Sequence, residues 1–210
     1  MNHSQRIALI GGTGKVGKYV ATKAIEKGYQ VRMLVRNPSK YTLTGIDVIK
    51  GDVQDRIAIQ QLIQECDVVI NAFGQPMKAH PIYSTVTQSI LEVMTESNIR
   101  RYIGVTGGSL SLNGDKKSMV NRFGSTVFEL LFSRMMNDKK KEWMVLLLNK
   151  HIDWTMVRLP FVLDKDEKQL IKEHLTDMPG STIRNGDIAT FLLQQIDNDS
   201  YIHKAPFISN

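Results

Sequence analysis

The strongest constraint on the fold is a glycine-rich segment near the start of the chain, Gly11-Gly-Thr-Gly-Lys-Val-Gly17. It follows a short apolar run over residues 7–10, which is typical of a buried strand. After it, Val16, Val20 and Ala24 recur every four residues, which predicts an amphipathic helix. The glycines are therefore expected at a strand-to-helix turn, the context that separates a dinucleotide-binding turn from a chance cluster of glycines.

Three glycines of this turn have different expected roles. Gly11 allows the tight turn, Gly14 lets the backbone approach a pyrophosphate, and Gly17 lets the helix pack closely on the strand. The free N–H groups and the dipole of the helix N-terminus then attract the phosphates. The spacing is G-x-x-G-x-x-G rather than G-x-G-x-x-G, and the alternative is a turn without a ligand. The turn residues expected at the cofactor are Gly11, Thr13, Gly14, Lys15, Val16 and Gly17.

Apolar runs and amphipathic segments alternate along most of the chain. Strands are predicted over residues 7–10, 30–35, 46–50, 67–71, 101–105, 154–158 and 205–209. Helices are predicted around residues 59–63, over 84–97, near 167–175 and over 187–196, the last with Asp187 as its N-cap. This alternation predicts an α/β fold of the Rossmann type, a doubly wound parallel sheet with helices on both faces.

The middle of the chain is less regular. Residues 110–117 have the composition of a loop, and residues 125–136 and 143–149 are apolar on either side of the polar run 138–142. The pattern predicts two helices with a polar break, or one bent helix that exposes the polar run. We expect residues 1–210 to form a single NAD(P)-binding Rossmann domain, with 107–149 and 161–184 covering the substrate beyond the carboxyl ends of the strands.

Composition narrows the functional classes. The lone cysteine, Cys66, excludes an internal disulfide, and no apolar run approaches the ~20 residues of a membrane helix. With no signal-like apolar segment at the N-terminus, these features predict a cytoplasmic protein without membrane contact. The net charge of +6 suits an anionic cofactor, whereas the lack of a basic run interleaved with aromatics argues against nucleic acid. The five histidines lack metal-ligand spacing, so no metal is expected.

The end of the second predicted strand indicates which nicotinamide cofactor is bound. NAD-specific folds place a carboxylate there for the ribose 2′-OH, but this strand ends in Leu34-Val-Arg36. Arg36 can pair with a 2′-phosphate, and Lys40 is close enough in sequence to help, so NADP(H) is favoured over NAD(H). The alternative is a solvated arginine. Asp52, after the third strand, is placed to accept a hydrogen bond from the adenine amino group, or to cap the next helix.

Together these residues resemble the atypical short-chain dehydrogenase/reductases, in a branch similar to NmrA-like proteins and biliverdin reductase B-type flavin reductases. The resemblance covers nearly the whole chain. It rests on the glycine turn and on residues 34–38, 51–53, 71–74, 152–160 and 185–193. It implies further cofactor contacts from Val53, Ala72, Phe73, Gly74, Thr106, Leu159 and Pro160.

The chain departs from the typical family pattern at the catalytic acid. Members of the family carry a Tyr-x-x-x-Lys pair, but the only such spacing here is Tyr19 to Lys23, in the first helix behind the phosphate turn. The catalytic residues are therefore unknown, and the weak candidates are Thr106, Ser109 and Lys140, the last because a basic residue in this region of relatives approaches the site. Apart from this candidate role of Lys140, residues 139–141 are expected to form a solvated turn.

The missing tyrosine bears on the reaction. Reducing a ketone needs a delivered proton, typically worth 10²–10⁴-fold in rate. A flavin or quinone accepts hydride readily and mainly has to be held in place. We therefore expect an NADPH-dependent oxidoreductase that transfers hydride to a small planar acceptor such as a flavin or quinone. The alternative is a non-catalytic NADP(H)-sensing regulator of the NmrA-like kind. An epimerase or dehydratase fits less well, because it needs the missing tyrosine.

Overall fold

One central sheet organises the chain. The computed structural model describes residues 4–40, 44–76, 79–166 and 168–210. Its sheet has the strand order β3-β2-β1-β4-β5-β6-β10-β8. The strands are β1 (Arg6–Ile10), β2 (Gln30–Val35), β3 (Ile46–Lys50), β4 (Val68–Asn71), β5 (Arg101–Gly107), β6 (Asp153–Leu159), β8 (Lys172–His174) and β10 (Phe207–Ser209). All of these pairings are parallel except that of β8 with β10, so the predicted doubly wound sheet is confirmed.

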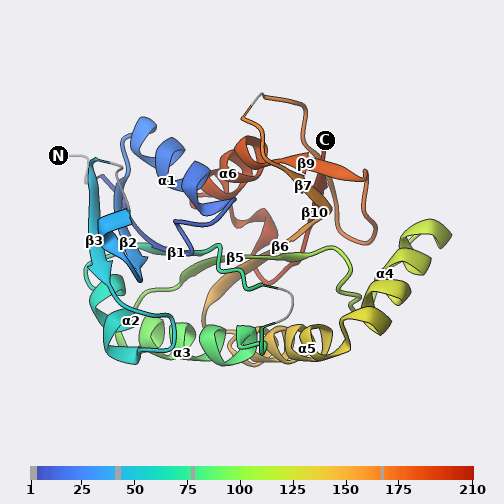
Figure 1. The fold of residues 1–210 in the computed structure, drawn as a ribbon, viewed down its shortest axis with the longest axis horizontal. Coiled ribbons are helices and arrows are strands. Elements are labelled where there is room, and N and C mark those ends of the chain that lie inside the picture. Colours follow the sequence, from blue (N-terminus) through green and yellow to red (C-terminus); the bar gives the residue numbers. More distant parts are fainter. Residues whose placement is uncertain (1–3, 41–43, 77–78, 167) are drawn as a thin grey trace.

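Helices cover both faces of this sheet (Figure 1). The helices α1 (Gly17–Glu26) and α6 (Asn185–Gln194) lie on one face, and α2 (Arg56–Ile63), α3 (Tyr83–Glu96) and α5 (Ser133–Leu148) lie on the other. Successive residues of a strand point to opposite faces, so Leu9 joins the core under α1 and α6 while Ile10 joins the core over α2 and α3. Burial on both faces explains why the central strands are continuous apolar runs.

The predicted cap Asp187 is wrong, and so is the alternative that Asp52 caps the next helix. α2 is capped by Asp55, whose carboxylate accepts a hydrogen bond from the Ile57 N–H at 2.9 Å. Asp52 instead accepts from the Gln54 N–H at 3.0 Å within the preceding turn. α6 begins two residues before Asp187, whose carboxylate accepts from the Gln169 N–H and from the Asn210 side chain, at 3.2 and 3.0 Å. Asp187 therefore ties the C-terminus to α6, because its partners come from distant segments.

The polar run 138–142 does not break a helix. The break falls at Phe132, between α4 (Met119–Leu131) and α5, and α5 runs without interruption through the polar run. Lys140 and Lys141 are exposed, but Asp138, Lys139 and Glu142 are buried. Their burial is possible because polar groups on α3 and within α5 provide hydrogen-bond partners. The expectation of a solvated turn over residues 139–141 is therefore wrong.

The region after β6 also differs from the prediction. Residues 168–175 form no helix, and Lys172–His174 is instead the edge strand β8, paired antiparallel with β10; residue 167 lies outside the described residues. A second small sheet pairs β7 (Phe161–Leu163) with β9 (Thr182–Arg184). Strands β7 and β9 lie above the central sheet in Figure 1, toward the end of the molecule from which α4 projects. Within the described chain, no helix is long and apolar enough to cross a membrane.

Candidate cofactor and acceptor site

The glycine turn is packed against the end of β4. Gly11 has a φ of +75°, and a Cβ added there would lie 2.5 Å from the carbonyl oxygen of Ala72. A Cβ at Gly17 would lie 2.2 Å from the carbonyl oxygen of Gly11. Both contacts are with backbone atoms, so neither position accommodates a side chain without moving the turn. Thr13, Gly14 and Lys15 are exposed, so the outer surface of the turn is accessible to a ligand.

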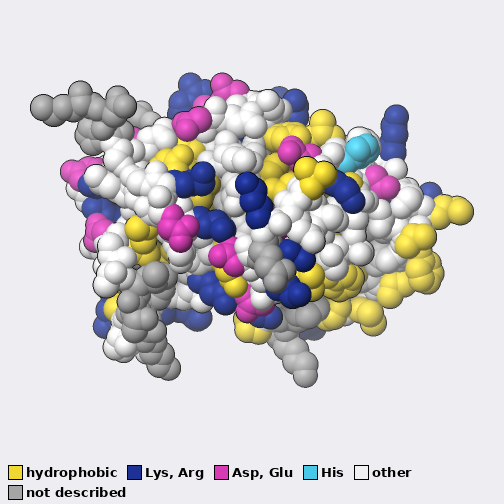
Figure 2. Space-filling view, turned by 90° about the horizontal axis from the view of Figure 1, so that it is seen from above, with side chains coloured by type: hydrophobic (Ala, Val, Ile, Leu, Met, Phe, Trp, Pro, Cys, Tyr) yellow, Lys and Arg dark blue, Asp and Glu magenta, His cyan; other side chains and the backbone are white. Residues whose placement is uncertain are grey.

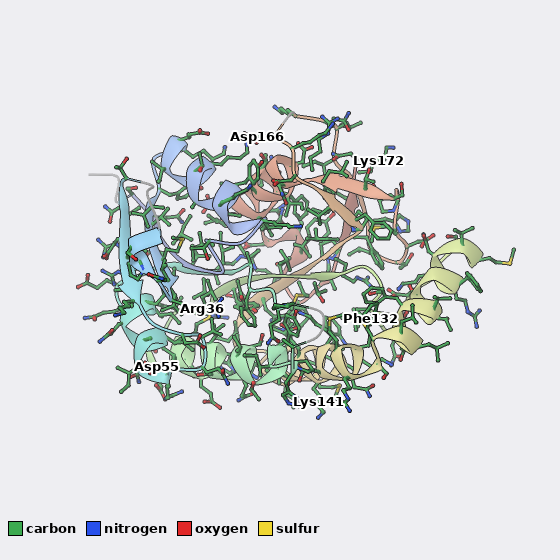
Figure 3. The ribbon with its side chains drawn as sticks, viewed as in Figure 1. Arg36, Asp55, Phe132, Lys141, Asp166 and Lys172 are labelled. Atoms are coloured by element: carbon green, nitrogen blue, oxygen red, sulfur yellow. The ribbon has the colours of Figure 1, made fainter. Side chains whose placement is uncertain are left out.

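Cationic side chains surround this turn without anionic partners. Arg36 is exposed directly after β2, at the end of that strand (Figure 3), and Lys15 is exposed on the turn. Within the described residues, neither Arg36 nor Lys15 forms an ion pair. The side chain of Lys40 lies outside the described part of the chain. Asp52 and Val53 follow β3, the strand that pairs with β2, so they lie at the same end of the sheet as Arg36.

The loop after β4 is fixed by buried hydrogen bonds. The Ala72 N–H donates to the Ile10 carbonyl at 2.9 Å, and the Phe73 N–H donates to the Asn71 side chain at 3.0 Å. The Asn71 amide in turn donates to the Tyr102 hydroxyl at 2.9 Å. Burial raises the pKa of Tyr102, so its phenol stays neutral and this network carries no charge at neutral pH. Ala72 and Phe73 are thus held beside the glycine turn.

A cavity of about 260 Å³ lies where β5 and β6 end. Its lining includes four of the residues predicted at the cofactor, together with Ser109 and apolar side chains from α4 and α5. They are Phe73, Tyr83, Val105, Thr106, Gly107, Ser109, Leu110, Phe128, Met135, Met136, Lys139, Leu159, Pro160 and Val162.

Thr106 provides a test of whether this cavity suits a ligand. Its hydroxyl is buried and has no hydrogen-bond partner among the described residues. Buried polar groups are normally paired, so an unpaired hydroxyl at a cavity indicates a partner that comes from a bound molecule. Together with the glycine turn and the loop at Phe73, the residues present fit a nicotinamide dinucleotide.

The structure places Lys139, and not Lys140, at this cavity. The Lys139 ammonium lies 2.8 Å from the Glu142 carboxylate and 3.5 Å from the centroid of the Tyr83 ring. Lys140 is exposed and pairs with Glu129. Burial raises the pKa of Tyr83, which therefore remains protonated at neutral pH.

The sequence analysis did not predict three residues at this site, which are Lys139, Glu142 and Tyr83. A signal for the first two exists, because Met136, Lys139 and Glu142 are spaced three residues apart and so share one face of a helix. Nothing in the local sequence indicates that Tyr83 joins them.

Hydrogen bonds between α3 and α5 hold this face in place. The Thr87 hydroxyl donates to Glu142 at 2.8 Å, and Asp138 accepts from both the backbone N–H and the hydroxyl of Ser84. Glu142 therefore contacts α3 and Lys139 at once. Ser109, on the opposite wall, directs its hydroxyl at the Met136 sulfur, 3.8 Å away, which is a weak contact.

Two cations anchor the loop that closes the cavity. Arg158 is buried, and its Nη1 donates to both carboxylate oxygens of Asp115, at 2.7 and 2.8 Å. The Lys117 ammonium donates to the Gly108 carbonyl and to the Ser125 hydroxyl, each at 2.9 Å. Partial burial lowers the pKa of Lys117 to about 8. The loop after β5 is thus tied both to β6 and to α4.

A parallel sheet with a glycine turn between its first strand and helix defines a dinucleotide-binding protein of the Rossmann class. A family model described as NAD(P)H-binding matches residues 11–199. The chain belongs to this NAD(P)H-binding family. Within the described chain, no three His, Cys, Asp or Glu side chains form a group that could hold a metal ion.

Curated relatives are distant. The uncharacterized protein YwnB of Bacillus subtilis is 24% identical over 152 residues, which are 72% of this chain and 70% of that protein. Eugenol synthase 1 of Petunia hybrida is 29% identical, and phenylcoumaran benzylic ether reductase 1 of Arabidopsis thaliana is 27% identical, each over 113 residues. These match 49% of this chain, and this chain spans only 35% of either plant enzyme.

Solved structures share the fold over almost the whole chain. A Veillonella parvula short-chain dehydrogenase/reductase in complex with NADP has a TM-score of 0.77 and 17% identity, covering 99% of this chain and 95% of that one. A Streptococcus pneumoniae protein, provisionally titled an NADH-flavin reductase, has a TM-score of 0.80 and 19% identity, covering 99% and 100%. At these identities the likeness establishes the fold.

Proposed function

We propose that this protein is an NADPH-dependent oxidoreductase that transfers hydride to a small planar acceptor such as a flavin or quinone. The observation that carries the proposal is the apolar cavity of about 260 Å³ at the ends of β5 and β6, which Thr106, Leu159 and Pro160 line. The reductase titles of the Arabidopsis and Streptococcus relatives are consistent with it.

In this proposal the cofactor lies along the ends of the central strands. Gly11, Thr13, Gly14, Lys15, Val16 and Gly17 hold the pyrophosphate. Arg36 pairs with the 2′-phosphate, so that NADP(H) is preferred to NAD(H). Asp52 and Val53 contact the adenine, and Ala72, Phe73 and Gly74 contact the ribose. Thr106, Leu159 and Pro160 border the nicotinamide, which supplies the hydride when it is bound.

The residues of the cavity then have separate roles toward the acceptor. Met135, Met136 and Phe128 exclude water and press the planar ring into position. The Lys139 ammonium, held by Glu142, stabilises negative charge that develops on the acceptor. The Thr106 hydroxyl donates a hydrogen bond to the bound ring. Residues 107–149 and 161–184 cover the substrate.

The first experiment measures NADPH oxidation by the purified protein with flavins, quinones and aldehydes as acceptors. We expect Lys139→Met to lower kcat by roughly 10²-fold, as removal of one preorganised electrostatic group commonly does. Lys141→Met is the matched control, because Lys141 lies on the outer side of the same helix (Figure 3) and should have little effect.

Lys139→Met also leaves Glu142 buried without its cation, which can reduce stability. The double variant Lys139→Met/Glu142→Gln removes that unpaired charge and separates lost folding from lost chemistry. It should fold and still turn over slowly. Normal turnover in the folded double variant would exclude the role proposed for Lys139. Tight NADPH binding with no turnover on any acceptor would support the NmrA-like sensor instead.

A further inference from the structure

A second cleft opens next to the cavity at the nicotinamide position. It has a volume of about 540 Å³ and lies between residues 79–81, which precede α3, and residues 131–135, at the corner between α4 and α5. Figure 3 labels Phe132 at this corner. We propose that this cleft binds an anionic group, such as a phosphate, carried by the planar acceptor. The inference rests on the proposed function, because it places the remainder of the acceptor molecule.

The two cavities share a wall. Met135 lines both of them. Phe128 lines the first cavity, Phe132 lines the second, and the centroids of their rings are 4.7 Å apart. A flexible methionine and two adjacent rings therefore form the boundary, across which a planar molecule can extend with its ring on one side and its substituent on the other.

The second cleft is cationic, in contrast to the first. Among the described residues, its titratable lining side chains are Arg134 and His80, and none is a carboxylate. Within the described residues Arg134 forms no ion pair. The nearby acids are already engaged: Glu129 pairs with Lys140, and Asp138 accepts two hydrogen bonds from Ser84. An arginine without an anionic partner is suited to bind a phosphate or carboxylate through two parallel hydrogen bonds.

The wall that carries His80 is held in place. The Gln75 side chain donates to the His80 carbonyl at 3.1 Å and accepts from the Ile82 N–H at 2.9 Å. The Gln75 N–H donates to the Tyr83 hydroxyl at 3.1 Å. The opposite wall is the corner between α4 and α5, and α5 is fixed to α3 by Asp138 and Glu142. Both walls are therefore set before a ligand arrives, which lowers the entropic cost of binding.

An apolar cavity beside a cationic cleft matches an acceptor with an apolar ring and an anionic tail. Flavin mononucleotide and riboflavin test this directly, because they share one ring system and differ by a phosphate. Menadione and a sulfonated naphthoquinone form a second pair, which distinguishes a requirement for negative charge from a requirement for phosphate itself.

The Kd of each of the four compounds is measured with the NADP+-loaded protein. The KM of each compound is measured in turnover with NADPH. We expect wild type to bind flavin mononucleotide more tightly than riboflavin. Arg134→Met should weaken flavin mononucleotide binding by about 10-fold, on the order of one charge-assisted hydrogen bond, with little change for riboflavin. Lys141→Met removes the same charge from the outer side of α5 and is the matched control (Figure 3).

The binding measurement separates this inference from the proposed function. If the protein shows no turnover but still binds flavin mononucleotide more tightly than riboflavin, the reductase activity is excluded and the anion site is supported. Equal Kd values for the two flavins in wild type, or an equal loss in Arg134→Met and Lys141→Met, would overturn the anion site even if the protein is an active reductase.

Discussion

The cofactor end and the acceptor end of this molecule are built in different ways. At the cofactor end, the glycine turn lies against backbone atoms of the neighbouring strand end, as the contact of Gly11 with Ala72 shows. At the acceptor end, α4 leaves large apolar side chains in solvent, with Met119 88% and Phe123 73% exposed. Figure 2 shows apolar side chains gathered at this end of the molecule.

The difference shows how each end depends on sequence. A site made of backbone needs only the absence of side chains at particular positions, and a single added Cβ is enough to disrupt it. A site made of side chains depends on which residues of α3 and α5 face each other, as Lys139 and Tyr83 do. We therefore expect substitutions in the glycine turn to affect folding, and substitutions of ligand-binding side chains to affect selectivity.

The largest effect is expected for Gly17→Val. Its Cβ would lie 2.2 Å from the Gly11 carbonyl oxygen and 2.6 Å from the Gly12 Cα, both backbone atoms. Overpacking usually costs about 1–3 kcal/mol, and a clash with backbone should lie at or above the top of that range. Urea unfolding would measure the loss, and NADPH binding should disappear.

Gly124→Ala is the control for that prediction. Gly124 lies in α4, and an added Cβ there would meet no atom within 4 Å. It should gain about 0.5–1 kcal/mol, because alanine restricts the unfolded chain and favours the helix. If Gly17→Val is as stable as wild type, the glycine turn is not rigid. The proposed difference between the cofactor end and the acceptor end would then be wrong.

The next effect concerns selectivity at the cofactor end. Arg36→Ala should weaken NADPH binding by roughly 10- to 100-fold, the equivalent of about 1.5–3 kcal/mol for hydrogen bonds to a charged group. NADH binding should hardly change, because NADH lacks the 2′-phosphate. Titrations of both cofactors against wild type and variant would measure this, and equal losses for the two would mean that Arg36 does not read the 2′-phosphate.

The smallest effect is expected at α4. Phe123→Ser replaces an exposed ring that contributes little to the core, so the free energy of unfolding should change by no more than about 0.5 kcal/mol. Solubility should rise, because the exposed apolar surface decreases. A loss of several kcal/mol on thermal or urea unfolding would instead show that this face is covered in solution, and the acceptor end would then be less open than its side chains indicate.

The sequence by itself determined the parallel strands of the central sheet and the position of the glycine turn. Apolar runs mark strands, apolar residues every three or four positions mark helices, and the glycines fit only a strand-to-helix turn. The family resemblance also placed Thr106, Leu159 and Pro160 at one site, and the structure has them around one cavity. These features are local, or follow from parallel pairing alone.

Tertiary structure decided what depends on partners far along the chain. Residues 172–174 form a strand because β10 pairs with them, although the local pattern predicted a helix. Asp138 and Glu142 in the polar run are buried because Ser84 and Thr87 on α3 donate hydrogen bonds to their carboxylates. The same packing turns Lys139 rather than Lys140 toward the cavity and places Tyr83 against it. Buried carboxylates need hydrogen-bond partners, and those of Asp138 and Glu142 come from α3, more than 50 residues earlier, so the local sequence does not reveal them.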